Sequence, residues 1–160
     1  MLNTITATLG GIAIDPIDFN IKTDLDSYCW QGGIKISDSQ YQKVKAKLDV
    51  ARGSEPLVIV TVNGVSYSFI AEEISRNRVF GNYSYSISGR SSTSHLGKDY
   101  AHSQGGTINQ DLYASQIINM QLADLPFTID RFEVKDWLIP AGTLNTSNQT
   151  PINIISQIAQ

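Results

Sequence analysis

His95, Asp99 and His102 have the spacing that comes nearest to a metal site in this sequence. Imidazole and carboxylate groups are zinc ligands, and steps of four and three residues would place them on one face of a helix. Gly97 interrupts any helix there, however, and the surrounding serines and glycines are typical of a loop. We therefore expect an exposed polar loop, with no metal and no other cofactor.

Two further groups of residues could suggest catalysis. Ser91 to Ser94 precede His95, but adjacent residues in a loop rarely reach the geometry of a nucleophile and its base, and no nucleophile elbow is visible. Glu72 and Glu73 could suggest a two-carboxylate hydrolase, but neighbours on a strand point to opposite faces and cannot flank one bond. The sequence thus predicts a protein that is not an enzyme.

Trp30, Tyr83 and Tyr85 are aromatic residues for which two interpretations stay open. They could form a platform on which sugar rings stack, which would indicate a carbohydrate or receptor-binding module. Aromatic residues that alternate along a strand belong to a hydrophobic core more often than to a ligand surface. We expect the core, and keep the binding module as the alternative function.

Composition excludes several classes of partner. The chain has 160 residues, of which 41% are hydrophobic and 17% are charged, and its formal net charge is -3. This composition is globular, and scattered Lys and Arg offer no basic stripe for nucleic acid. The lone cysteine, Cys29, allows no internal disulfide. We expect no membrane span and no signal peptide, because the apolar run near the start is short and no basic segment precedes it.

The clearest structural signal is the stretch LVIVTVNGVSYSFI, which predicts a β-hairpin. Asn63 and Gly64 supply the two positive-φ residues of a type I′ turn, and this two-residue loop sets the register. The expected cross-strand pairs are Val62 with Val65, Val60 with Tyr67 and Val58 with Phe69 on one face, and Thr61 with Ser66 on the other. The first of these faces should be buried.

Gly89 and Arg90 follow a predicted strand that includes Tyr83, Tyr85 and Ile87. We expect a structural corner here, in which Gly89 takes a positive φ and the Arg90 guanidinium ties down the serine-rich loop that follows. Residues 88–106 are poor in hydrophobic side chains and predict that loop.

Three short helices complete the expected fold. The helix after Ser37 has a capping box with Gln40, a second has one formed by Thr107 and Gln110, and the last begins at Thr150-Pro151. In the first helix, one face is expected to hold Tyr41, Val44, Leu48 and Ala51. The helix is expected to end at Arg52-Gly53. FTIDRFEV and WLIPAG predict short strands between the second and third helices.

This order of elements indicates an α+β fold that is mainly antiparallel β-sheet. We expect two parts, a strand-rich, barrel-like part with one helix over residues 1–90 and an α/β part over residues 91–160. The second part should pack with the first. The apolar pattern of its last helix runs to the C-terminus, from which we expect the chain to be a piece of a longer protein.

Three motifs in sequence order carry a resemblance to a known family. FIAEEISRNRVFGNYSYSISGRSSTSHL is followed, after a helix, by DWLIPAG and then by TPINIISQIA. This series resembles the hub-type tail proteins of long-tailed bacteriophages, over roughly residues 57–160. In that family a strand ends in Ser/Thr-Gly-Arg, and a Trp-containing strand ends near Pro-Ala-Gly. The resemblance implies that Trp137 and Gly142 are structural corner residues, as Gly89 and Arg90 are.

The resemblance also implies a function. Hub proteins join the tail tube to spike or tail-tip proteins, are typically homotrimers, and have barrel-like domains that mimic the tail-tube fold. The implied role is a baseplate hub or tail-tip component of a phage or prophage tail, made in the bacterial cytoplasm and located in the virion tail. The family carries no catalytic residues onto this stretch, and the residues that contact partners are not indicated.

Overall fold

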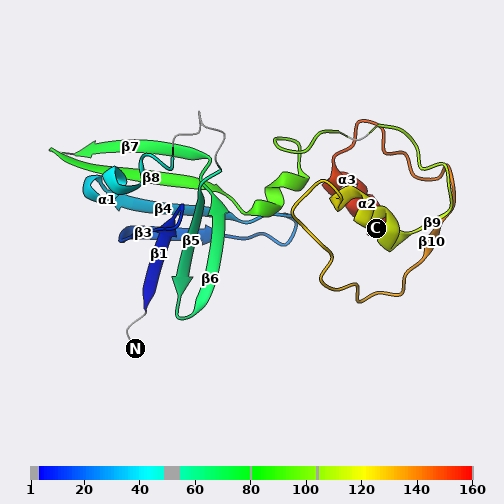
Figure 1. Ribbon diagram of the computed structural model, residues 1–160, viewed down its shortest axis with the longest axis horizontal. Coiled ribbons are helices and arrows are strands. Elements are labelled where there is room, and N and C mark those ends of the chain that lie inside the picture. Colours follow the sequence, from blue (N-terminus) through cyan, green and yellow to red (C-terminus); the bar gives the residue numbers. More distant parts are fainter. Residues whose placement is uncertain (1–3, 49–54, 80, 104, 160) are drawn as a thin grey trace. The chain divides into compact units, whose positions relative to one another are not determined.

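The computed structural model describes residues 4–48, 55–79, 81–103 and 105–159 (Figure 1). The chain divides into two compact units, residues 1–93 and residues 94–160. The boundary lies within the serine-rich stretch that the composition marks as a loop. A 3-10 helix, η2 (Ser92–Leu96), occupies part of that stretch.

The first unit contains two four-stranded antiparallel sheets. One has the strand order β2-β1-β5-β6, and its strands are β1 (Ile5–Leu9), β2 (Ile12–Ile14), β5 (Leu57–Val62) and β6 (Val65–Ile70). The other has the order β3-β4-β8-β7, and its strands are β3 (Pro16–Lys22), β4 (Gln31–Ser37), β7 (Glu73–Val79) and β8 (Asn82–Arg90). Neither sheet closes into a barrel within the described residues.

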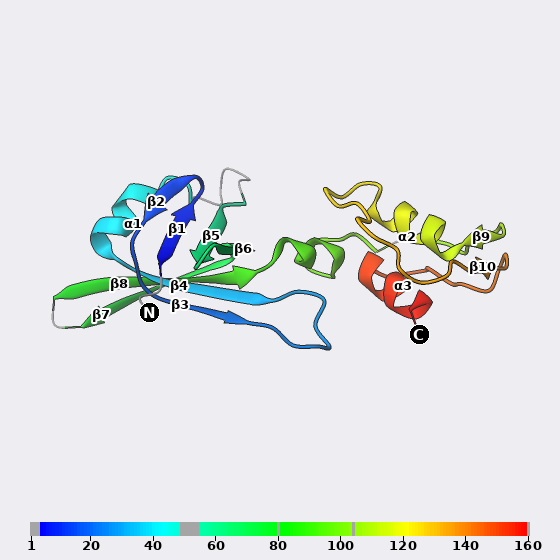
Figure 2. The ribbon, with the colours of Figure 1, turned by 90° about the horizontal axis from the view of Figure 1, so that it is seen from below.

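One hydrophobic core joins the two sheets of the first unit. The β3-β4-β8-β7 sheet runs along one side, with α1 and the first sheet over one of its faces (Figures 1 and 2). Both sheets, α1 and the residues that follow α1 and β6 contribute buried side chains, which are Ala7, Leu9, Ile14, Ile34, Ile36, Val44, Leu48, Val58, Val60, Phe69, Ala71, Tyr85 and Ile87. The barrel-like part is therefore an open pair of packed sheets.

The predicted hairpin is confirmed in register and turn type. Asn63 has a φ of 51° and Gly64 one of 87°, as a type I′ turn requires. Every expected cross-strand pair is present. The buried face holds Val58, Val60 and Phe69, whereas Val65 beside the turn is 55% exposed. The core thus covers the hairpin along most of its length but not at its tip.

The first predicted helix is α1 (Asp38–Val44), and its start is confirmed. The Ser37 hydroxyl accepts the Gln40 backbone N–H at 3.4 Å. The Gln40 side chain donates to the Asp15 carboxylate at 2.7 Å instead of returning to the cap. Val44 and Leu48 are buried as predicted. Ala51 and the expected end at Arg52-Gly53 lie outside the described residues.

The second unit has a small core between two helices and a two-stranded sheet. Its elements are β9 (Leu112–Tyr113), α2 (Ala114–Leu122), β10 (Leu138–Ile139) and α3 (Pro151–Ile158). The buried side chains are Ile108, Ala114, Ile117, Ile154 and Ile158. The two helices pack together, so each presents its apolar face to the other.

Two sequence predictions for the second unit are wrong. The second helix begins at Ala114, after the N-cap residue Tyr113, and not after Thr107, which forms an isolated bridge with Asn145. No strand covers FTIDRFEV, whose described residues are irregular, although WLIPAG does contain β10. Helix α3 begins at Pro151 with Thr150 as its N-cap residue, as predicted.

The α+β class with three short helices and mainly antiparallel strands is confirmed. Within the described residues, none of the helices is both long and apolar enough to cross a membrane.

Candidate functional site

The residues with metal-ligand spacing lie at η2 and in the turns after it. Backbone bonds from Gly97 to Ser94 and from Ala101 to Gly97 fold this stretch, and the His95 ring lies 4.5 Å from the Tyr100 ring. Within the described residues, no three His, Cys, Asp or Glu side chains come together as a metal site would require. The stretch is therefore a set of turns in which one histidine packs against a tyrosine.

Ser91, the first of the serines before His95, makes hydrogen bonds inside the first unit. The Ser91 hydroxyl accepts the backbone N–H of Trp30 at 3.2 Å and lies 2.7 Å from the Thr93 hydroxyl. Ser91 is 2% exposed, so this bond ties the start of β4 to the end of β8 inside the first unit. These contacts give Ser91 a structural role.

The three aromatic residues do not form one platform. Tyr85 is buried, stacks on Tyr41 with ring centroids 3.7 Å apart, and donates to the Asp38 carboxylate at 3.2 Å. Burial and that hydrogen bond raise the pKa of the Tyr85 phenol. Tyr83 has the Arg76 and Arg78 guanidinium carbons 4.3 and 5.4 Å from its ring centroid.

Trp30 lies at the other end of the same sheet. Its neighbour Gln31 pairs with Arg90, whereas Tyr83 lies seven residues earlier on β8. At about 3.3 Å per residue, this separation exceeds roughly 20 Å. The Trp30 indole N–H donates to the Ser68 carbonyl at 3.0 Å. A single sugar ring could not reach both Trp30 and Tyr83.

Gly89 marks a close crossing of strands and not a turn. It lies within β8, pairs in register with Gly32, and does not have a positive φ, so the expected positive φ is wrong. A Cβ on Gly89 would lie 1.7 Å from the Ile70 carbonyl oxygen, and one on Gly32 would lie 2.2 Å from Phe69. Glycine is needed at both positions because β6 passes directly over them.

Arg90 makes a bidentate ion pair with Glu72. Its Nε lies 3.0 Å from both carboxylate oxygens, and its Nη2 lies 2.9 Å from Oε1. Both side chains are about three-quarters buried, with exposures of 25% and 23%. We expected Arg90 to hold the serine-rich loop; its ion pair with Glu72 joins the end of β8 to the connection between β6 and β7. This pairing strengthens the place where the two sheets meet.

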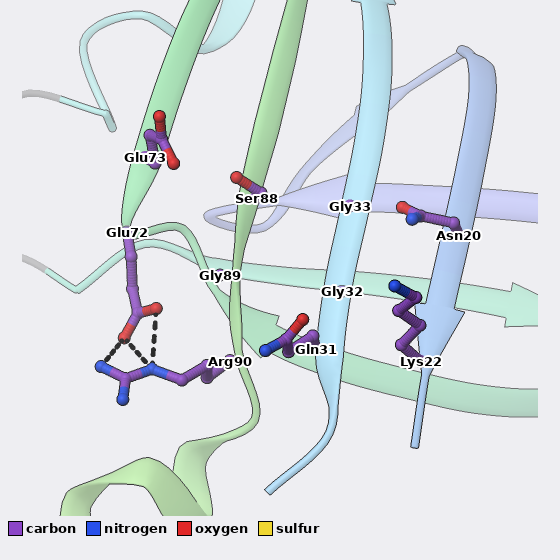
Figure 3. A pocket seen from close by; sticks show the side chains of 10 residues that line it. All are labelled: Asn20, Lys22, Gln31, Gly32, Gly33, Glu72, Glu73, Ser88, Gly89 and Arg90. Carbon is purple, nitrogen blue, oxygen red and sulfur yellow. Dashed lines mark hydrogen bonds and ion pairs between the residues drawn. The ribbon is translucent and has the colours of Figure 1, made fainter. Parts of the chain in front are cut away.

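A shallow hollow of about 300 Å³ lies on the face of β3-β4-β8-β7 beside this ion pair (Figure 3). Asn20, Gly33, Ser88 and Glu73 form one row across the four strands. Lys22, Gln31 and Arg90 lie along the next outward-facing row, and Glu72 lies beside Arg90 (Figure 3). Because Gly33 brings no side chain, the hollow opens over β4.

The chemistry of this hollow is polar and balanced in charge. Two cations, Lys22 and Arg90, are matched by two carboxylates, Glu72 and Glu73. Because the Glu72 carboxylate is bound by Arg90, it is poorly placed to act as a general base. The hollow therefore suits hydrogen bonding to another surface better than proton transfer.

Trp137 and Gly142, expected at a corner, flank the short strand β10 in the second unit. Gly142 has a φ of 77°, and its N–H donates to the Ile108 carbonyl at 2.7 Å. The preceding Ala141 N–H donates to the Asp111 carboxylate at 2.8 Å. The Trp137 carbonyl accepts the Ala114 N–H at 2.9 Å, and the residue is 40% exposed. Gly142 thus sits in a turn, and Trp137 joins β10 to the start of α2.

Sequence reasoning missed Asp136, which lies beside Trp137. Its carboxylate accepts from the Ser115 backbone N–H and hydroxyl, at the N-terminus of α2, and from the Trp137 N–H. The bond from the Ser115 hydroxyl is the main reason that the pKa of Asp136 lies below its ordinary value. The capping group comes from 21 residues away, so the sequence around the helix carries no signal for it.

Comparison with known proteins gives similarity at the level of structure. The sequence matches no family model, and no curated protein matches it. The fold is similar to the tail protein from Neisseria meningitidis MC58, with a TM-score of 0.71 and 14% identity over 98% of this chain. It is also similar to the prophage MuSo2 43 kDa tail protein from Shewanella oneidensis, with a TM-score of 0.67 and 12% identity over 97% of this chain.

These likenesses extend over both units, so the chain has the fold of part of each of these two proteins. It spans 45% of the length of the Neisseria protein and 48% of the length of the Shewanella protein.

Proposed function

We propose that this chain is a structural part of a bacteriophage or prophage tail. The observation that carries the proposal is the likeness of almost the whole chain to two solved structures that are both described as tail proteins. The series of motifs that contains Gly89-Arg90, Gly142 and Thr150-Pro151 supports it independently, because that series resembles hub-type tail proteins.

Within the tail, we place the chain in the hub or baseplate, where it joins the tail tube to spike or tail-tip proteins. The two parts expected at 1–90 and 91–160 act as building blocks of a longer protein that assembles as a homotrimer. The mechanism is assembly without catalysis. Only 17% of the residues are charged, so polar surfaces of subunits can close with few ions to desolvate.

Cryo-electron microscopy of the parent virion tests this function. Density for both units at the distal end of the tail, repeated with threefold symmetry, is the expected result. Density elsewhere in the tail would leave a tail role and remove the hub assignment. A virion whose complete map lacks both units would contradict the proposed function altogether.

The mass of the full-length protein in solution tests the oligomer separately. Light scattering coupled to size-exclusion chromatography should give three times the mass of one chain. A monomeric mass over a wide range of concentrations would count against trimeric assembly while leaving location in the tail to the microscopy.

A further inference from the structure

Two arginines on β7 share one aromatic ring near the end of the β3-β4-β8-β7 sheet. The Arg76 and Arg78 guanidinium carbons lie 4.3 and 5.4 Å from the ring centroid of Tyr83, and both arginines are exposed. Contact with the ring restricts these long side chains, so two cations are held close together before any partner binds. Within the described residues, no carboxylate forms an ion pair with either of them. This arginine pair therefore suits two carboxylates of a partner.

The turn between β3 and β4 carries two carboxylates. Asp24 and Asp26 flank Leu25, and all three residues are exposed, Leu25 fully so. The Ser27 backbone N–H donates to the Asp24 carbonyl at 3.2 Å, and the Asp26 N–H donates to the Asp24 carboxylate at 3.3 Å. Because these two bonds close the turn, its side chains are presented on an ordered loop.

The arginine pair and this turn lie at opposite ends of the same sheet (Figures 1 and 2). Arg78 pairs with Tyr83, near the start of β8. The turn lies beyond Gln31, which pairs with Arg90 at the end of β8. The seven residues from Tyr83 to Arg90 span more than roughly 20 Å, at about 3.3 Å per residue. The two groups of charge therefore cannot meet within one chain, but they can meet between copies.

We propose that the Asp24–Asp26 turn of one copy docks on the arginine pair of a second copy. Charge selects this occupant, because two carboxylates meet two guanidinium groups and arginine binds carboxylates with paired hydrogen bonds. Exposed ion pairs contribute little affinity by themselves. Leu25, between the carboxylates, and Val79, which follows Arg78 and is 53% exposed, supply apolar surface for the contact to cover.

This contact joins opposite ends of the chain, so it is heterologous and passes from each copy to the next. Heterologous contacts close into a ring or extend into a filament. A ring of three such contacts would form the proposed homotrimer. The inference thus rests on the proposed assembly and deepens it, by naming a surface through which the copies meet.

Sedimentation of the 160-residue chain at low ionic strength, up to millimolar concentration, tests the contact. We expect the natural chain to self-associate and added salt to weaken the association, because salt screens exposed charges. Asp24→Lys combined with Asp26→Lys places like charges opposite the arginine pair, and should weaken self-association about tenfold or more. Arg76→Glu combined with Arg78→Glu should weaken it by a similar factor.

All four substitutions in one chain exchange the two sets of charge and keep the natural net charge. This variant should self-associate about as tightly as the natural chain, although each pair of substitutions alone prevents it. Asp130→Lys combined with Glu133→Lys is the matched control, because it changes the net charge as much as the variant of the turn does, but at exposed positions of the second unit. We expect this control to associate as the natural chain does.

Three results would overturn the docking contact. The first is a chain with all four substitutions that does not associate, and the second is a loss in the control as large as in the variant of the turn. The third is a natural chain that stays monomeric at every concentration. None of these results bears on location in the tail, which the microscopy of the virion tests separately.

Discussion

The carbonyl oxygen of Ile70 occupies the space in which a side chain on Gly89 would begin. A Cβ at Gly89 would lie 1.7 Å from that oxygen and 2.9 Å from the carbonyl carbon. Ile70 ends β6 in one sheet and Gly89 lies in β8 of the other, so the two sheets are in direct backbone contact here. Backbone atoms form this contact, and they cannot rotate away as a side chain could.

Gly89→Ala should therefore destabilise the first unit strongly. We expect a loss of roughly 3 kcal/mol in the free energy of unfolding, at the upper end of the cost of overpacking a core. Urea unfolding measures this loss when tryptophan fluorescence is followed in a Trp137→Phe background, in which Trp30 alone reports on the first unit.

Gly33→Ala is the matched control for that substitution. Its new Cβ would lie 2.2 Å from Asn20 Oδ1, which is the far end of an exposed side chain and can move aside. We expect a change within about 0.5 kcal/mol. Equal losses for the two variants would show that backbone crowding at Gly89 does not decide its identity.

Arg90→Lys should weaken the ion pair that joins the end of β8, beside Gly89, to the connection between β6 and β7. Lysine keeps the charge but cannot form the two-pronged contact with Glu72, whose side chain is three-quarters buried. Because both groups keep some contact with water, we expect a loss of only about 1 kcal/mol. A double-mutant cycle with Glu72→Gln isolates the coupling between them.

The exposed pair Arg131–Glu133 provides the comparison for this ion pair. Its N···O distance is 2.8 Å, but its side chains are 79% and 65% exposed. Arg131→Lys should change stability by less than about 0.5 kcal/mol. If both arginine variants cost the same, the burial of the Arg90–Glu72 pair has no energetic consequence.

Local patterns predicted the elements whose causes are local. The Asn63-Gly64 turn set the register of β5 and β6, because two residues with positive φ determine a hairpin turn. Ser37 and Pro151 likewise marked the starts of α1 and α3. In each case the residues that cause the structure lie within a few positions of it.

Elements that depend on distant contacts were predicted poorly. Position 89 requires glycine because the Ile70 carbonyl oxygen, 19 positions earlier in the sequence, leaves no room for a Cβ. The residues next to Gly89 in the sequence could suggest only a turn. The start of α2 is capped by Asp136, which comes from a distant segment. Thr107 lies nearer in the sequence and was predicted as the cap only because of its residue type. The hollow beside Arg90 could not be predicted either, because it gathers residues from several separate segments.

Asn63→Ala should destabilise the hairpin for two reasons. Alanine disfavours the φ of 51°, and it lacks the Oδ1 that accepts the Thr4 N–H at 3.1 Å. We expect a loss of about 1 to 2 kcal/mol in thermal or urea unfolding. Asn63→Gly tolerates the backbone angle but still lacks the acceptor, so it should lose less. A larger loss for glycine than for alanine would contradict the importance of the positive φ.

Because of Asp136, the stability of the second unit should depend on pH in the acid range. Its pKa in the folded chain lies below the ordinary value of 3.8, chiefly because the Ser115 hydroxyl donates to the carboxylate. A carboxyl group whose pKa is lower in the folded chain binds protons more tightly in the unfolded chain. The stabilisation that Asp136 gives is therefore complete above pH 3.8, and it is lost as the pH falls through the pKa of the folded chain. The difference in stability between the natural chain and Asp136→Asn should therefore be constant near neutral pH and shrink below 3.8.

Comparing the two proteins at each pH cancels the titration of the other carboxyl groups, so the difference reports Asp136 alone. Ser115→Ala supplies the control, because it removes the main cause of the shift. The pKa of Asp136, followed by carbon-13 resonance of its carboxyl group, should rise toward the ordinary value in this variant. A difference between the natural chain and Asp136→Asn that stays constant down to about pH 2 would mean that the cap at the start of α2 contributes nothing through its charge.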